Sequence, residues 1–165
     1  MSSSLTSSNT AAAPVLDPEL ANQVFDRLHD IGFDGRGMTR PSYGEGENRA
    51  HALFEDIARE HGLEIRRDWA SNLFITLPGR NRDLPVIMTG SHVDTVPCGG
   101  NFDGAAGAIA GLLILCAWAR AAFQPERDTT LIVTRAEESV WFPVSYLGSR
   151  TAFGLLPAEA LETPR

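Results

Sequence analysis

The sequence contains little cysteine, with only Cys98 and Cys116 among 165 residues. Two cysteines cannot build a disulfide framework, and no Cys-x-x-Cys pair is present. A reducing compartment fits this usage, so we expect a cytoplasmic protein. The N-terminus agrees, because its first 20 residues have no basic residue and no long apolar core of the kind that marks a signal peptide.

Positive charge is also scarce. The chain has 14 Lys and Arg against 21 Asp and Glu, which gives a net charge of -7. No basic run offers a counter-charge to phosphates, so we expect no nucleic-acid partner. The glycines never form G-x-G-x-x-G and no Walker A lysine is present, so a nucleotide-binding Rossmann unit is the weaker hypothesis.

No apolar run is long enough to span a membrane. The longest uncharged candidate, residues 104–119, has 16 residues and lies between Asp103 and Arg120. A spanning helix needs about 20 residues. We interpret this segment as a helix buried inside a domain, and we expect no membrane partner.

The first residues differ from the rest in composition. Ser, Thr and Ala dominate the first 13 residues, so residues 1–16 are predicted to be a disordered tail. Residues 17–165 have ordinary globular composition, with 43% hydrophobic residues in the whole chain. We expect one domain there.

Hydrophobic periodicity and turn residues divide this domain into alternating elements. The glycine-rich residues 34–47 are predicted to be a loop, and residues 85–90 a buried central strand. Strand, buried helix and strand at 85–134 form a βαβ unit with parallel strands, which predicts an α/β fold. Helices are expected at 17–33, 50–61, 104–119 and 144–153, and strands at 63–69, 73–77, 85–90 and 129–134.

Ionisable residues follow both strands of the βαβ unit. His92, Asp94 and Asp103 follow the first strand, and Glu137 and Glu138 follow the second. Working residues of open α/β sheets gather beyond the carboxyl ends of strands. Each residue alone has an ordinary interpretation: a helix N-cap for Asp103, an Asx-turn for Asp94, a strand-end histidine, and solvated glutamates. Their combination at one edge favours a metal site.

These residue types suit a two-metal hydrolase. His92 can supply an imidazole nitrogen to a metal, and Asp94 can fix its tautomer from behind. Asp103 can offer one oxygen to each of two ions about 3.5–4 Å apart. Of the two adjacent glutamates, one can ligate and the other can act as general base.

The stretch GSHVDTVPCGGNFDG, residues 90–104, resembles a characteristic block of the N-carbamoyl-L-amino acid hydrolase, allantoate amidohydrolase and β-ureidopropionase family. These enzymes are relatives of aminoacylase and carboxypeptidase-type di-zinc peptidases. The spacings of 11 positions from His92 to Asp103 and 35 from Asp103 to Glu138 are similar to those of the family. Residues 62–74, GLEIRRDWASNLF, also resemble a family stretch.

The resemblance implies a three-layer α/β sandwich with a mainly parallel or mixed central sheet. It implies two divalent ions (Zn, Mn, Co or Ni), with His92 and Glu138 as ligands of different ions and Asp103 as the bridge. Glu137 would be the catalytic base, and Asp94 would orient His92. The implied reaction is hydrolysis of a linear amide C–N bond in a small carbamoyl or ureido substrate. The resemblance does not identify any substrate-binding residue.

The chain departs from the family pattern in two ways. Ser139 and Trp141 stand where the family usually has Gly and Arg, and we interpret Trp141 as core-filling rather than pocket-lining. The family also uses two further histidine ligands downstream, whereas His29, His51 and His61 read as surface or packing residues, and we expect no ligand role for Cys98. The resemblance therefore predicts residues 17–165 to be the N-terminal portion of a catalytic domain, from a homodimeric protein more than twice as long. The 165-residue chain alone is expected to be incomplete and inactive. Two alternatives remain: a non-catalytic interaction module with a degenerate metal site, or a metallopeptidase of the same superfamily.

Overall fold

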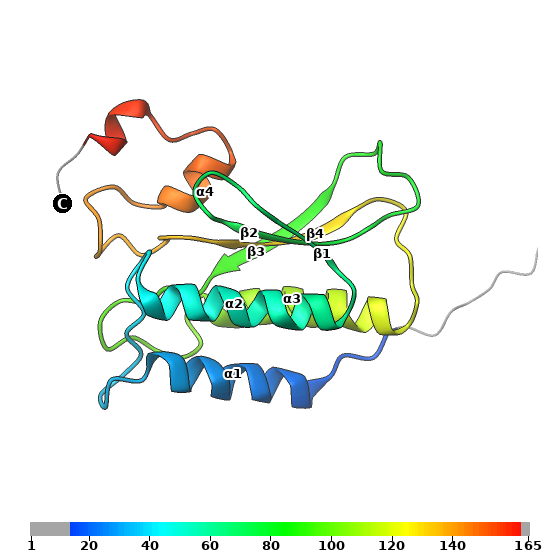
Figure 1. Ribbon diagram of the computed structural model, residues 1–165, viewed down its shortest axis with the longest axis horizontal. Helices are drawn as coiled ribbons and strands as arrows, with labels where there is room; N and C mark the ends of the chain where they lie inside the picture. Colours follow the sequence, from blue (N-terminus) through cyan, green and yellow to red (C-terminus); the bar gives the residue numbers. More distant parts are fainter. Residues whose placement is uncertain (1–13, 163–165) are drawn as a thin grey trace, which may run out of the picture.

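A four-stranded mixed sheet lies at the centre of the computed structural model, which describes residues 14–162 (Figure 1). The strand order is β1-β2-β4-β3. The predicted α/β class and mixed sheet flanked by helices are thus confirmed. Most of the predicted N-terminal tail, residues 1–13, lies outside the described part of the chain. The strands are β1 (Glu64–Arg67), β2 (Leu73–Leu77), β3 (Ile87–His92) and β4 (Thr129–Thr134).

Strand pairing places the ends of β3 and β4 at one edge of the sheet. β1 and β2 form an antiparallel hairpin, and β2 pairs antiparallel with β4. β3 and β4 run parallel, with His92 opposite Thr134. The parallel βαβ unit predicted from the sequence is therefore confirmed, and residues that follow its two strands emerge side by side.

The three long helices lie on one side of the sheet, and the short α4 lies on the other side near the end of β4 (Figure 1). Leu73, Ile75, Leu131 and Val133 belong to the buried core that the helices cover. No helix within residues 14–162 is both long and apolar enough to cross a bilayer. The helices are α1 (Pro18–Gly32), α2 (Glu45–Glu60), α3 (Ala105–Arg120), α4 (Leu147–Ala152) and the 3-10 turn η1 (Ala158–Leu161).

The ends of α1 and α2 follow from their capping residues. The Asp17 carboxylate accepts a hydrogen bond from the Leu20 amide at 3.1 Å, and Pro18 begins α1. Gly62 has a φ of +67°, the left-handed conformation that terminates a helix at little cost in glycine. α2 begins at Glu45, inside the segment predicted to be loop, because two glycines at 44 and 46 masked the start of its apolar periodicity.

One strand was placed wrongly by the sequence prediction. The apolar run at residues 85–90 was expected to be a buried central strand, but β3 spans Ile87–His92 and lies at the edge of the sheet. Ile87 and Met88 are 56% and 37% exposed. The reason is topological: β4 pairs on one side with β2 and on the other with β3, so the central position belongs to β4.

Candidate metal centre

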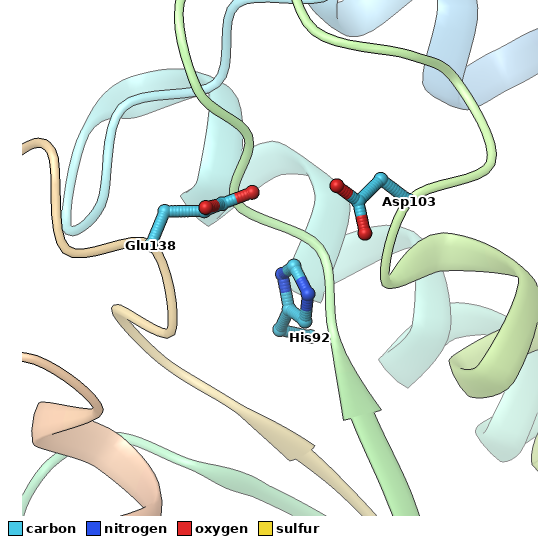
Figure 2. Close-up of side chains that lie close together, drawn as sticks. All are labelled: His92, Asp103 and Glu138. Carbon is cyan, nitrogen blue, oxygen red and sulfur yellow. The ribbon is translucent and has the colours of Figure 1, made fainter.

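Three of the predicted ligands come together at the edge where β3 and β4 end (Figure 2). His92 is the last residue of β3, Asp103 closes the loop before α3, and Glu138 follows β4. Each offers one ligand atom, and these atoms lie within 4.8 Å of one another. The Asp103 and Glu138 carboxylates approach the His92 ring from opposite sides (Figure 2). One imidazole nitrogen and two carboxylates form a donor set suited to a divalent transition metal.

Gly104 makes room for the His92 ring. Its φ is +63°, and a Cβ built on it would lie 2.5 Å from ring atoms of His92. Gly104 is also the N-cap of α3, so the N-cap interpretation of Asp103 is wrong. The Asp103 carboxylate is therefore not used to cap the helix.

Asp94 lies behind His92 and is fully buried. Its Oδ1 is 3.3 Å from His92 Nδ1, which also lies 3.0 Å from the Asp94 carbonyl oxygen. The Ser42 hydroxyl donates to Asp94 Oδ2 at 2.6 Å. The backbone amides of Glu137 and Glu138 donate to Oδ1 and Oδ2 at 3.3 and 3.1 Å. One carboxylate thus contacts both the histidine and the loop that carries the two glutamates.

His92 and Asp94 stabilise each other's charged forms, whereas the carboxylates around Glu138 repel its charge. Burial works to lower the pKa of His92, but the hydrogen bond and negative charge of Asp94 outweigh it and raise that pKa above its ordinary value. Burial acts to raise the pKa of Asp94, but hydrogen bonds from His92, Ser42 and Glu138 lower it overall. Burial and neighbouring carboxylates, with His92 opposing them, raise the pKa of Glu138. Clustered negative charge of this kind favours a bound cation.

Glu137 lies beside the three clustered residues. Its Oε2 is 3.6 Å from His92 Nε2, and its side chain is one-third exposed. It also lines an open cavity of about 430 Å³ on the sheet face opposite the long helices. Met88, Ile132 and Phe153 give this cavity an apolar wall, and Ser149 and Thr134 contribute hydroxyls. A small molecule in the cavity would lie next to the Glu137 carboxylate.

Sequence reasoning missed the residues that anchor the loop after β4. Glu47 and Asn72 are fully buried, and their side-chain oxygens accept hydrogen bonds from backbone amides of Ala136 and Arg135. One signal was present for Glu47, since it stands three and seven positions before Ala50 and Phe54 and so shares their buried helix face. Asn72 lies within residues 62–74, which resemble a family stretch, but nothing local predicted its contact with Arg135 across 63 positions.

The other candidates lie away from the three clustered residues. His29 is exposed, and His61 contacts the carbonyl oxygen of Ile57. His51 is buried in α2, and burial holds its pKa well below the usual value. Cys98 is exposed. Trp141 is half-buried, and its indole N–H donates to the carbonyl oxygen of Thr95 at 2.8 Å.

Comparison with known proteins identifies the family of this chain. Residues 72–161, which include all five predicted site residues, match Peptidase family M28. The chain belongs to this family. Its curated relatives include amidohydrolases, which confirms the resemblance predicted from the sequence.

Three relatives of this M28 family chain illustrate the similarity. The chain is 35% identical over 144 residues to an N-carbamoyl-L-amino acid amidohydrolase of Geobacillus stearothermophilus, covering 85% of the chain and 35% of the relative. It is 36% identical over 130 residues to an allantoate amidohydrolase of Escherichia coli strain K12, covering 78% and 31%. It superposes with a TM-score of 0.83 on a hydantoinase/carbamoylase family amidase from Burkholderia ambifaria, at 28% identity and covering 88% and 36%. The chain thus spans about a third of the length of these relatives.

Proposed function

We propose that this chain forms part of a metal-dependent amidohydrolase that cleaves linear amide C–N bonds in N-carbamoyl or ureido amino acids, or in allantoate-like compounds. The observation that carries the proposal is the cluster of His92, Asp103 and Glu138 with Glu137 beside it. The names of the relatives support the substrate class, since they include amidohydrolases of N-carbamoyl-L-amino acids and of allantoate.

The residues present fit a divalent cation. Their ligand atoms are within 4.8 Å of one another, and Gly104 leaves open the space that a Cβ would take from the His92 ring. We propose that two divalent cations would be held here, with Asp103 as their shared ligand, His92 as a ligand of one and Glu138 as a ligand of the other. The bound cations would polarise the substrate carbonyl and acidify a water molecule.

The chain's own residues then carry out proton transfer. Glu137 accepts a proton from the water that adds to the carbonyl carbon, and it delivers that proton to the nitrogen as the C–N bond breaks. Asp94 accepts from the His92 ring and thereby directs the other ring nitrogen toward the cluster. For an N-carbamoyl amino acid, one water is consumed, and the products are the amino acid, carbon dioxide and ammonia.

A second candidate is hydrolysis of peptide bonds. The observation that favours it is the match to a peptidase family over residues 72–161. The chemistry would be the same, because water adds to an amide carbonyl and a protonated nitrogen leaves. The two candidates differ only in the groups attached to that amide.

The test combines metal content with turnover. We expect purified protein to retain Mn²⁺ or Zn²⁺ after dialysis, measured by elemental analysis, and His92→Ala or Asp103→Ala to lose it. His29→Ala is the matched control, because His29 is exposed and distant in sequence from the cluster. Ammonia release from N-carbamoyl-L-amino acids and allantoate is compared with amine release from dipeptides.

Glu137→Gln separates catalysis from binding. In the full-length protein, we expect this variant to keep its metal and to lose about two to four orders of magnitude in turnover. Retained turnover would contradict the assignment of Glu137 as the base. Failure of the unmodified protein to bind either metal would favour the non-catalytic interaction module.

A further inference from the structure

Four consecutive backbone amides after β4 are held by buried side chains. The Arg135 amide donates to Asn72 Oδ1 at 2.8 Å, and the Ala136 amide donates to Glu47 Oε1 at 3.1 Å. The next two amides donate to Asp94, as described above. Peptide groups joined in series cannot move independently, so each of these bonds restrains its neighbours. The positions of the Glu137 and Glu138 side chains depend on this run of bonds.

Glu47 is the member of this set that joins the loop to a buried ion pair. Its Oε2 accepts from the Tyr43 amide at 2.6 Å and lies 2.8 Å from Arg135 Nη2, while Oε1 accepts from Ala136. The Arg135 guanidinium also donates to Asn48 Oδ1 at 2.7 Å. Glu47 and Arg135 are 0% and 3% exposed, so the pair is removed from solvent. Hydrogen bonds in such surroundings are electrostatically stronger than bonds exposed to water.

The backbone held by Glu47 is strained. Ala136 has a φ of +49°, in the left-handed region that residues other than glycine avoid. This conformation costs about 1 kcal/mol or more and persists only where surrounding contacts enforce it. It turns the chain between β4 and Glu137, and thus aims the two glutamates at His92 rather than along the strand direction.

We propose that Glu47 is a positioning residue, which acts through the Ala136 amide to hold Glu137 and Glu138 against His92 and Asp103. Glu47 does not touch the reacting groups, and its role is to fix the geometry of residues that do. The effect of Glu47 on catalysis rests on the proposed function. The restraint that Glu47 places on the loop after β4 does not depend on that function.

Glu47→Gln is the substitution that tests this role most directly. It keeps the size of the side chain but replaces one oxygen with an NH₂ group, which is a donor. In one orientation that donor would face the Ala136 amide, and in the other it would face both the Tyr43 amide and Arg135; all of these groups are donors themselves. Glu45→Gln is the matched control, because Glu45 is an exposed glutamate in the same first turn of α2.

The measurement is hydrogen exchange of individual backbone amides in the 165-residue chain without metal. In Glu47→Gln we expect the Glu137 and Glu138 amides, which Glu47 does not contact, to exchange about tenfold faster or more, while amides of α3 keep their rates. In Glu45→Gln all these rates stay unchanged. Unchanged exchange at Glu137 and Glu138, or an equal acceleration throughout α3, would overturn the proposal, since the second result means a loss of global stability only.

Titration with Co²⁺, followed by its visible absorption, links the restraint to the metal centre. If the unmodified chain binds Co²⁺, Glu47→Gln is expected to weaken binding about tenfold or more, as loss of outer-shell partners does. Equal affinity in both proteins would count against the positioning role. If neither protein gives a Co²⁺ spectrum, the proposed metal function fails, and the exchange rates alone decide the role of Glu47.

Discussion

At the scale of single residues, Gly104 joins the geometry of the metal centre to the stability of the fold. We predict that Gly104→Ala lowers the free energy of unfolding by about 1–3 kcal/mol, because its φ is +63° and the added Cβ would meet the His92 ring at 2.5 Å. Urea denaturation measures the change. The control is Gly100→Ala, where an added Cβ meets no heavy atom of the described chain within 4 Å. Equal stability of the two variants would contradict the prediction.

Glu47 gives a second prediction at this scale, in pH dependence. Burial raises the pKa of Glu47 to about 7 from 4.5, although the charge of Arg135 opposes it. Between these values the folded protein keeps a proton that the unfolded chain has released, so its stability falls as pH rises through this window. The full difference amounts to about 3 kcal/mol.

The glutamine side chain of Glu47→Gln does not titrate, so comparison with this variant isolates the contribution of Glu47 to the pH dependence of stability. We expect the unfolding free energy of the unmodified protein, minus that of Glu47→Gln, to decrease from pH 4.5 to about 7 and then to level off. The subtraction cancels the contributions of the other carboxylates to the unfolding free energy, because those carboxylates are common to both proteins. A Glu47 difference that rises with pH would show that the ionised form is the one stabilised by folding.

At the scale of elements, the close packing of α3 on the sheet depends on glycine. A Cβ at Gly111 would lie 2.8 Å from Leu131 Cδ1 and 3.2 Å from Thr89 Cγ2. The helix can therefore pack this close to the strands because position 111 has no side chain. We predict that Gly111→Val destabilises the protein by about 1–3 kcal/mol through overpacking. Ala110→Val introduces the same side chain one position away, at an exposed site, and should change stability by less than about 0.5 kcal/mol. Thermal or urea unfolding of the pair tests this.

Elements also show which parts of the fold a sequence can specify. Apolar periodicity and capping residues located the α-helices and strands within about five positions, because those signals are local, but they did not predict the 3-10 turn η1. The edge position of β3 was missed, since an apolar run records that side chains can be buried and not which strands will pair beside them. The start of α2 was missed for a local reason, because Gly44 and Gly46 look like loop residues although the helix begins between them.

The same distinction applies to the candidate site. His92 and Asp103 lie in one short stretch, and Glu138 could be added to them because parallel strands end at one edge of the sheet. Glu47 could not be added in this way, since its contact with Ala136 joins residues 89 positions apart. Such a contact exists only after α2 has packed beside the strands. Candidate ligands can therefore be predicted from local sequence. The residues that hold those ligands in place cannot, because their contacts form only through tertiary packing.

At the scale of the whole molecule, a bound cation should stabilise the fold. A ligand that binds only the folded state adds about 2.7 kcal/mol when its concentration is 100 times its dissociation constant. For a chain of 165 residues, each kcal/mol raises the melting temperature by about 2–4 °C. We therefore predict that saturating Mn²⁺ raises the melting temperature of the chain by about 5–10 °C, and that a chelator reverses the shift.

The His92→Ala variant tests whether this stabilisation comes from the metal centre. Removing the imidazole from the cluster leaves two carboxylates, which would hold a transition metal less tightly and would tie β3 and β4 together less firmly. The Mn²⁺-induced rise in melting temperature should fall below about 2 °C in His92→Ala. It should remain complete in His29→Ala, because the exposed His29 side chain lies on α1 and not at the ends of β3 and β4. A full shift in His92→Ala would mean that the cation stabilises the chain at another site. Because His92 ends β3 while Glu138 follows β4, a shift specific to His92 would show that metal binding ties together the two strands of the βαβ unit.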